Sequence, residues 1–299
     1  MQTISEIRAL LAERGLHPKH RMGQNFLHDQ NHLRRLISAA EIRPGDLILE
    51  VGPGTGTLTE ALLEAGADVI ACELDRDLAD LIHDRLDGRI TLIRGDCLDK
   101  GRTLNPEIVA AIAGRDFKLV ANLPYQIASP LMTALLIDHP TCRGQFITIQ
   151  REVAERLVAG PSTKAYGPLS IIIQAFAEVH RIATLRPTCF WPPPKVDSAM
   201  VSILPSSPGR GSGGGGGSKS GGEGVLTEVS ALSTADSRRA FARFVTELFM
   251  KRRKQLGTIF GRGRSFPAGI TPDLRPEALS VERTIALFQD VTQRPSDAL

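Results

Sequence analysis

The tetrapeptide Asn122-Leu123-Pro124-Tyr125 has the residue types and order best suited to chemistry on a nucleobase. An exocyclic amine of a base is a poor nucleophile because its lone pair is delocalised into the ring, so a site that alkylates it must hold the nitrogen still. The Asn122 carboxamide oxygen and a backbone carbonyl fixed by Pro124 could accept its two N–H bonds, while the Tyr125 ring could stack on the base. Asn and Pro also punctuate ordinary turns, and on these residues alone a strand-to-turn connection is the simpler interpretation.

A glycine-rich turn upstream adds a second signal. Residues 46–51 predict a strand, which leads directly into Gly52-Pro53-Gly54-Thr55-Gly56 and a helix over about 57–65. Strand, glycine turn and helix open a nucleotide-binding α/β unit, because glycines let a ligand approach the backbone and the helix N-terminus accepts polar groups. The spacing is G-x-G-x-G rather than the G-x-G-x-x-G of dinucleotide folds, and glycine turns also arise for conformational reasons alone.

Polar residues follow the next strands in the same way. Glu73 ends a strand predicted over 67–72 and is placed to accept hydrogen bonds from two ribose hydroxyls. Asp96 follows a strand over 90–94 and could bind an adenine amino group, and Asn122 follows a strand over 117–121. In an open parallel sheet, ligands bind at the carboxyl ends of the strands. Four successive strand ends therefore predict one ligand site, formed by Gly52, Glu73, Asp96 and Asn122.

The remaining pattern continues the alternation of helices and strands. Helices are predicted over residues 4–16, 31–40, 128–138 and 152–158, and further strands over 145–149, 169–179 and 199–204. This predicts an α/β fold with a seven-stranded sheet. The segment Phe190-Trp191-Pro192-Pro193-Pro194 is expected to be a stiff exposed loop that presents Phe190 and Trp191. They could form a second stacking wall for a base, pack internally, or belong to a proline-rich ligand segment.

Composition limits the class of protein. The chain has 299 residues, is 42% hydrophobic and carries a net charge of +3, which fits a globular protein that can have an anionic partner. Its cysteines are scattered without a Cys-x-x-Cys pair, and His28 and His32 lack accompanying ligands, so we expect no metal and a reducing cytoplasm. No apolar stretch reaches the roughly 18 residues of a membrane span, and no secretory signal is recognisable.

The last third of the chain predicts a tether and a small helical domain. Residues 205–224, with five consecutive glycines, cannot bury apolar area and are expected to be a flexible linker between domains 1–204 and 225–299. Apolar residues over 236–260 have helical spacing, and a last helix is predicted over about 275–290. The cationic run Lys251-Arg252-Arg253-Lys254 suits an RNA backbone, although a solvated charged face is the alternative.

Together these segments resemble the small-subunit rRNA adenine N6-dimethyltransferase family over most of residues 19–205. The matching segments are Gly23-Gln24-Asn25-Phe26-Leu27, Glu50 to Gly56, Asn122 to Tyr125, Gln150 to Leu157, Lys164-Ala165-Tyr166-Gly167, and Phe190 to Ser198. The resemblance implies a class I, Rossmann-like methyltransferase with a small C-terminal helical domain that binds rRNA. It implies that S-adenosylmethionine contacts Asn25, Leu27, Gly52, Glu73, Asp96 and Asn122, while Tyr125 and Phe190 bracket the target adenine.

By the same resemblance, the substrate would be two adjacent adenosines in a hairpin loop near the 3′ end of 16S rRNA, in the small ribosomal subunit. The chain is expected to act as a monomer. Two positions depart from the family pattern: Gln126 replaces an Asn, and Pro168 replaces an Arg that could contact phosphate. The alternatives are a non-catalytic ribosome-assembly factor, a 23S rRNA adenine methylase of the macrolide-resistance type, and a DNA adenine methylase. Retention of the glycine turn and of Asn-Leu-Pro-Tyr disfavours the first, and Leu123 with the Lys-Ala-Tyr-Gly segment disfavours the second.

Overall fold

A computed structural model of the protein describes residues 1–100, 102–206 and 232–294, which form two compact units. The first unit contains Met1–Ala154 and Val179–Leu204, and the second contains Glu155–Glu178 and Pro205–Leu299. Residues 155–178, which the sequence-based division assigns to the first domain, therefore group with the C-terminal part of the chain. Most of the expected linker, from residue 207 to 224, lies outside the described residues.

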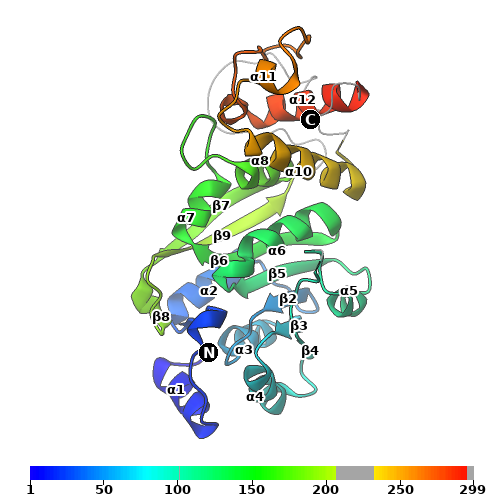
Figure 1. Ribbon diagram of the computed structural model, residues 1–299. Helices are drawn as coiled ribbons and strands as arrows, with labels where there is room; N and C mark the ends of the chain where they lie inside the picture. The colour runs from blue at the N-terminus through cyan, green and yellow to red at the C-terminus, as the bar shows by residue number, and fades with distance from the viewer. Residues whose placement is uncertain (101, 207–231, 295–299) are drawn as a thin grey trace. The chain divides into compact units, whose positions relative to one another are not determined.

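A seven-stranded sheet organises the first unit, as predicted (Figure 1). Its strand order is β4-β3-β2-β5-β6-β9-β7. The five neighbouring strands β4, β3, β2, β5 and β6 are parallel, whereas β9 runs antiparallel to β6. The bounds of these strands are β2 (Leu47–Val51), β3 (Asp68–Glu73), β4 (Thr91–Arg94), β5 (Phe117–Asn122), β6 (Cys142–Gln150), β7 (Ala177–Leu185) and β9 (Ser198–Pro205). The α/β fold class with a Rossmann-like sheet is thus confirmed.

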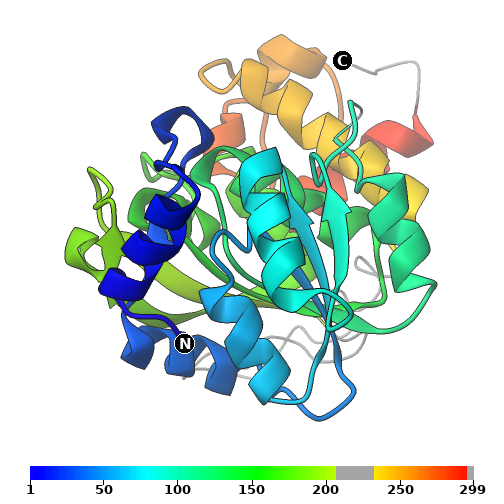
Figure 2. The same cartoon turned by 90° about the horizontal axis from the view of Figure 1, so that it is seen from below.

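Several helices of the first unit begin at local capping signals. In chain order, the helices that precede β6 are α1 (Ile4–Glu13), α2 (Gln30–Ala39), α3 (Thr57–Glu64), α4 (Arg76–Leu86), α5 (Pro106–Ile112) and α6 (Tyr125–Asp138). Asp29, Asp75 and Asn105 cap α2, α4 and α5, since each side chain accepts a backbone N–H of the first helical turn. In the turned view of Figure 2, the cyan helix α4 lies in front of the strands.

One strand of the sheet was wrongly placed from the sequence. Residues 169–176, predicted as part of a strand, lie in helix α8 (Pro168–Phe176), and the strand β7 follows at Ala177. Isoleucines at 171–173 are β-branched and favour strands, but α8 is buried on nearly all sides, so its apolar residues show no helical periodicity. Pro168 in the first turn, after Gly167 at the N-cap, was the available sign of a helix start.

The second unit is helical and has an aromatic core. It includes α8, α10 (Ala235–Met250), α11 (Leu256–Phe260) and α12 (Val281–Gln293); α7 (Arg151–Leu157) runs from the first unit into it. The helix predicted over 236–260 is therefore interrupted at 251–255. The Phe241 ring packs edge-on against Phe176 of α8 and Phe288 of α12. The Tyr166 hydroxyl donates a buried hydrogen bond to the Leu279 carbonyl, which ties residues 113 positions apart.

None of the helices in the described parts of the chain is long and apolar enough to span a membrane.

Candidate active site

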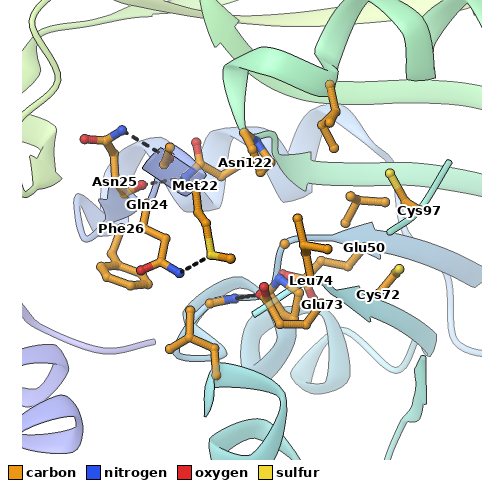
Figure 3. Close-up of a pocket in the computed structure, with 18 of the residues that line it drawn as sticks. Met22, Gln24, Asn25, Phe26, Glu50, Cys72, Glu73, Leu74, Cys97 and Asn122 are labelled. Carbon is orange, nitrogen blue, oxygen red and sulfur yellow. Dashed lines mark hydrogen bonds between the residues drawn. The ribbon is translucent and has the colours of Figure 1, made fainter. Parts of the chain in front are cut away.

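A pocket opens at the carboxyl ends of β2 to β5, where the sequence predicts the ligand site (Figure 3). All six residues expected to contact the methyl donor line it: Asn25, Leu27, Gly52, Glu73, Asp96 and Asn122. Asn25 and Leu27 come from the segment before α2, and the others follow successive strands. The sheet topology brings these residues together because parallel strands direct their carboxyl ends to one edge.

Glycine is required at two points of the turn after β2. Gly54 has a φ of +61°, and a Cβ atom there would lie 2.8 Å from the Phe26 ring. Gly52 has a φ of +73°, and its Cβ would lie 3.3 Å from Cδ of Pro124. Any side chain at these positions would be strained and would fill the pocket wall. The turn thus exposes its backbone to a ligand, next to Pro124 of the Asn-Leu-Pro-Tyr segment.

Glu73 is held at the end of β3 by two backbone donors. The N–H of Gly54 lies 3.2 Å from Oε2, and the N–H of Asp75 lies 2.9 Å from Oε1. Burial raises the pKa of Glu73 to about 7, although both hydrogen bonds oppose the shift. A carboxylate in this place can accept a pair of hydroxyl groups, as ribose recognition requires. Asp96 follows the neighbouring strand β4 and also lines the pocket, and its side chain accepts the Leu98 N–H at 3.0 Å.

The Asn122 amide is oriented by a hydrogen bond to the backbone. Its Nδ2 donates to the Asn25 carbonyl at 2.9 Å, which assigns the two ends of the carboxamide. Among the described residues no donor reaches Oδ1, so this oxygen is free to accept a hydrogen bond from a substrate. Leu123 is buried and its N–H donates to the Thr148 carbonyl at 3.2 Å, which anchors the backbone beside the amide.

Tyr125 begins helix α6 rather than lying in a loop before it. Its hydroxyl lies 2.7 Å from Oγ of Ser198, the first residue of β9, and Ser198 is fully buried. Burial raises the pKa of Tyr125, so the phenol is neutral at physiological pH. The hydroxyl bond and the helix start together fix the ring direction. Ser198 was matched within a motif, but its partner could not be known without the fold.

Phe190 does not lie where the sequence suggests. It pairs in a two-stranded sheet, β1 (Phe26–Leu27) with β8 (Phe190–Trp191), and is only 3% exposed within the hydrophobic core. The expectation that the proline-rich segment presents Phe190 is therefore wrong. Trp191 is partly exposed; it stacks on Phe26 at 6.3 Å, and the Arg8 guanidinium lies 5.2 Å from its ring centroid. A role of Phe190 in bracketing a base stays a prediction that requires the ring to be uncovered.

The pocket also contains a buried acid that the sequence did not single out. Glu50 of β2 is 1% exposed, lines the pocket, and its Oε2 has no hydrogen-bond partner among the described residues. Burial raises the pKa of Glu50 to about 8, and the nearby Glu73 charge acts in the same direction. Glu50 is thus a neutral acid near pH 7 and can donate as well as accept a hydrogen bond. The available signal was its place two residues before the glycine turn, at the start of a segment that matches the family pattern.

A polar network fixes the segment that carries Asn25. Gln24 donates to Oδ2 of Asp75 at 2.6 Å, and the Lys19 ammonium lies 2.8 Å from Oδ1 of the same residue. Burial of Asp75 would raise its pKa, but the bonds from Lys19 and Gln24 outweigh it and lower the pKa. Leu74, which directly precedes Asp75, also lines the pocket and is 52% exposed, so its side chain can contact a flat ring.

The four cationic residues of the run Lys251–Lys254, in the second unit, differ in their contacts. Nε of Arg252 lies 2.6 Å from a Glu277 oxygen, so this cation forms an internal ion pair. Lys251, Arg253 and Lys254 are exposed and have no ion pair within the described chain. They surround a cavity of the second unit together with Lys164 and Arg275. We call Lys164, Lys251, Arg253, Lys254 and Arg275 the basic surface; Lys164 and Arg275 were missed from the sequence because they lie far from the run.

The fold and the pocket define a class of protein. A seven-stranded sheet with β9 antiparallel, a glycine turn after β2 and an acid at the end of β3 are the features of a class I methyltransferase, which uses S-adenosylmethionine. The residues present fit this molecule, because a Cβ at Gly52 or Gly54 would close the backbone cradle and because Glu50 has an unpartnered buried oxygen. The Asn-Leu-Pro-Tyr segment at the end of β5 lies beside this cradle, where Asn122 and Pro124 line the pocket.

Comparison with known proteins identifies the family. Residues 15–209 match the family model of ribosomal RNA adenine dimethylases, and the chain belongs to this family. The "Ribosomal RNA small subunit methyltransferase A" of Yersinia enterocolitica is 35% identical over 267 residues, which cover 87% of this chain and 89% of the relative. The protein of the same name from Corynebacterium jeikeium is 35% identical over 305 residues, covering 95% and 93% of the two chains.

Solved structures support the fold. A dimethyladenosine transferase from Plasmodium falciparum aligns with a TM-score of 0.68 at 24% identity, covering 90% of this chain and 98% of that one. The 23S rRNA methyltransferase ErmE aligns with a TM-score of 0.54 at 23% identity, covering 90% of this chain and all of that one.

Proposed function

We propose that this protein uses S-adenosylmethionine to dimethylate N6 of two adjacent adenosines, in a hairpin loop near the 3′ end of 16S rRNA within the small ribosomal subunit. The observation that carries the proposal is the oriented Asn122 amide, whose free Oδ1 lies at the edge of the cofactor pocket. The names of the relatives at 35% identity support the small subunit as the substrate.

The cofactor supplies an electrophilic methyl group on a sulfonium. The chain holds it by the Gly52–Gly56 backbone, by Glu73 at the ribose hydroxyls, by Asp96 at the adenine amine, and by Leu74 against the adenine ring. Asn25 and Leu27 close the pocket from the other side. Glu50 stays neutral beneath this pocket, which avoids a second negative charge next to Glu73.

The target base is held by the residues after β5. Oδ1 of Asn122 and the Leu123 carbonyl accept the two N6–H bonds, which localises the amine lone pair toward the methyl carbon. The Tyr125 ring, fixed by Ser198, stacks on the adenine. The new N–C bond forms as the C–S bond breaks, leaving S-adenosylhomocysteine. The methylated amine is acidic and loses its proton to water, so no strong general base is needed, and a second transfer gives N6,N6-dimethyladenosine.

The basic surface of the second unit suits an RNA backbone. Five cationic side chains around one cavity repel one another, and bound phosphate groups would relieve this repulsion. Single-stranded loops let bases leave the helix, which the pocket requires. We expect the acting form to be a cytoplasmic monomer.

Tritium transfer from labelled S-adenosylmethionine to unmethylated small subunits tests the proposal. Nuclease digestion should yield dimethyladenosine at two equivalents per subunit, and N122A, a matched inactive variant, should give almost none. Label on the large subunit instead would move the assignment to the 23S rRNA methylases. Binding of the small subunit without any transfer would move it to a non-catalytic assembly factor.

A further inference from the structure

Three side chains of metal-ligating types meet, and none of them is among those that line the cofactor pocket. Nδ1 of His32 lies 3.1 Å from a carboxylate oxygen of Asp29, and Sγ of Cys189 lies 4.0 Å from the same nitrogen. Sγ also lies 3.9 Å from the other carboxylate oxygen, Oδ2 of Asp29. We propose that Asp29, His32 and Cys189 bind one divalent transition-metal ion of the zinc type.

The three donors come from separate parts of the first unit. Asp29 caps α2 and His32 lies in its first turn, whereas Cys189 ends the short helix η2 (Pro187–Cys189), directly before β8. The His28 N–H donates to the Cys189 carbonyl at 3.1 Å and holds the two segments side by side. From the sequence, His32 was paired with His28 and no metal was expected; the fold instead brings His32 to a thiol 157 residues away.

The distances suit a tetrahedral ion. Bonds of about 2.3 Å to sulfur and about 2.0–2.2 Å to nitrogen or oxygen place tetrahedral ligand atoms roughly 3.3–3.6 Å apart. One donor atom from each residue can be chosen so that all three lie within 4.8 Å of one another. Nδ1 of His32 is near Oδ1 of Asp29, whereas Sγ of Cys189 is near Oδ2, so binding through one oxygen needs side-chain shifts of up to about 1 Å. Three protein ligands leave the fourth position to water.

The alternative is a cap with no ion. Oδ1 of Asp29 accepts the His32 N–H at 3.0 Å, and this bond with the contact to Nδ1 explains why Asp29 and His32 meet. It does not explain the thiol, which lies at the outer limit of sulfur hydrogen bonding to both. A sulfur, nitrogen and carboxylate set favours zinc over magnesium or calcium, which take oxygen ligands.

The site is open enough to be filled and is placed to stabilise the fold. The side chains of His32 and Asp29 are 20% and 32% exposed, so an ion and its water can enter from solvent. Bound metal would join the start of α2 to the segment before β8, whose partner β1 follows Asn25. We therefore expect zinc to raise the melting temperature of the full-length protein, without any requirement for S-adenosylmethionine.

Cobalt(II) titration of the chelator-treated full chain tests the proposal, with zinc competition to obtain the affinity. A sulfur-to-cobalt charge-transfer band should appear at one equivalent and disappear in C189A, but persist in C142A, which removes another buried thiol. D29N keeps a helix-capping side chain and should lower the affinity for zinc at least tenfold. H32Q, which leaves the hydrophobic core intact, should lower it by a similar factor. The proposal would be overturned if the band survived in C189A. It would also be overturned if H32Q and D29N had the same zinc affinity, and the same zinc-induced rise in melting temperature, as the unaltered protein.

Discussion

Replacing Asn122 by alanine is the most direct test of how the site works. The change removes both ends of an oriented amide: Nδ2, which donates to the Asn25 carbonyl at 2.9 Å, and the free Oδ1 that we assign to the target amine. The hydrogen bond that Oδ1 accepts from N6 strengthens as N6 gains positive charge. Its loss therefore destabilises the transition state more than the bound substrate. Removing one preorganised group of this kind lowers kcat about 10²–10³-fold, or about 2.7–4 kcal/mol.

The same substitution should affect cofactor binding much less. It leaves the Asn25 carbonyl without its partner at a partly exposed position, which costs about 1 kcal/mol at most. Since 1.4 kcal/mol is a tenfold change in affinity, S-adenosylmethionine binding should weaken less than tenfold. The contacts that we propose for Gly52, Glu73 and Asp96 are unchanged in this variant. Single-turnover tritium transfer to small subunits gives the rate, and calorimetry with S-adenosylmethionine gives the affinity.

N122D separates the acceptor from its orientation. Aspartate keeps an oxygen for the substrate but replaces the donor that faces the Asn25 carbonyl with a second acceptor, so the two oxygens repel. We expect N122D to lose at least tenfold in rate with its melting temperature nearly unchanged. Full turnover of N122A, or equal losses of rate and cofactor affinity in both variants, would refute the role assigned to this amide.

Three further outcomes follow from other contacts. In the folded protein the pKa of Glu50 is about 8 rather than the usual 4.5, so the native state binds this proton more tightly than the unfolded state. Stability therefore falls as pH rises between those values. In thermal melts from pH 5 to 9, the melting temperature of E50Q should decline less than that of the unaltered protein. S198A and Y125F remove the same 2.7 Å bond, so their losses in transfer rate should be several-fold and the double variant no worse than either. R253E should lower the slope of log affinity for small subunits against log salt by about 1 or more in filter binding, whereas R252A, which breaks the pair with Glu277, should lower the melting temperature.

The residues that line the pocket could be predicted from the sequence because the backbone determines where they lie. A strand end fixes where Gly52, Glu73 and Asp96 lie, and alternation of strands and helices is a local pattern. The prediction needed no knowledge of side-chain packing. The assignment of a strand failed for residues 169–176, where the near-complete burial of α8 removed the periodicity that separates a helix from a strand.

The base-binding half depends on burial and long-range contacts, which a sequence pattern does not report. Phe190 was expected on the surface because prolines follow it, but pairing of β8 with β1 buries the ring. Tyr125 stays a prediction, and its hydroxyl partner Ser198 lies 73 residues away on β9. Glu50 was overlooked for a similar reason: its raised pKa comes from its surroundings and not from its neighbours in sequence.

Asn122 connects the two halves, and this explains why one amide matters to both. Its side chain lines the cofactor pocket, and its Nδ2 donates to the backbone carbonyl of Asn25, which lines the same pocket. The remaining oxygen stays available to accept a hydrogen bond, and we assign it to the substrate. An ordered cofactor would steady the Asn25 segment and, through this bond, the acceptor for N6. We therefore expect bound cofactor to strengthen adenosine binding in the unaltered protein, and this coupling to disappear in N122A.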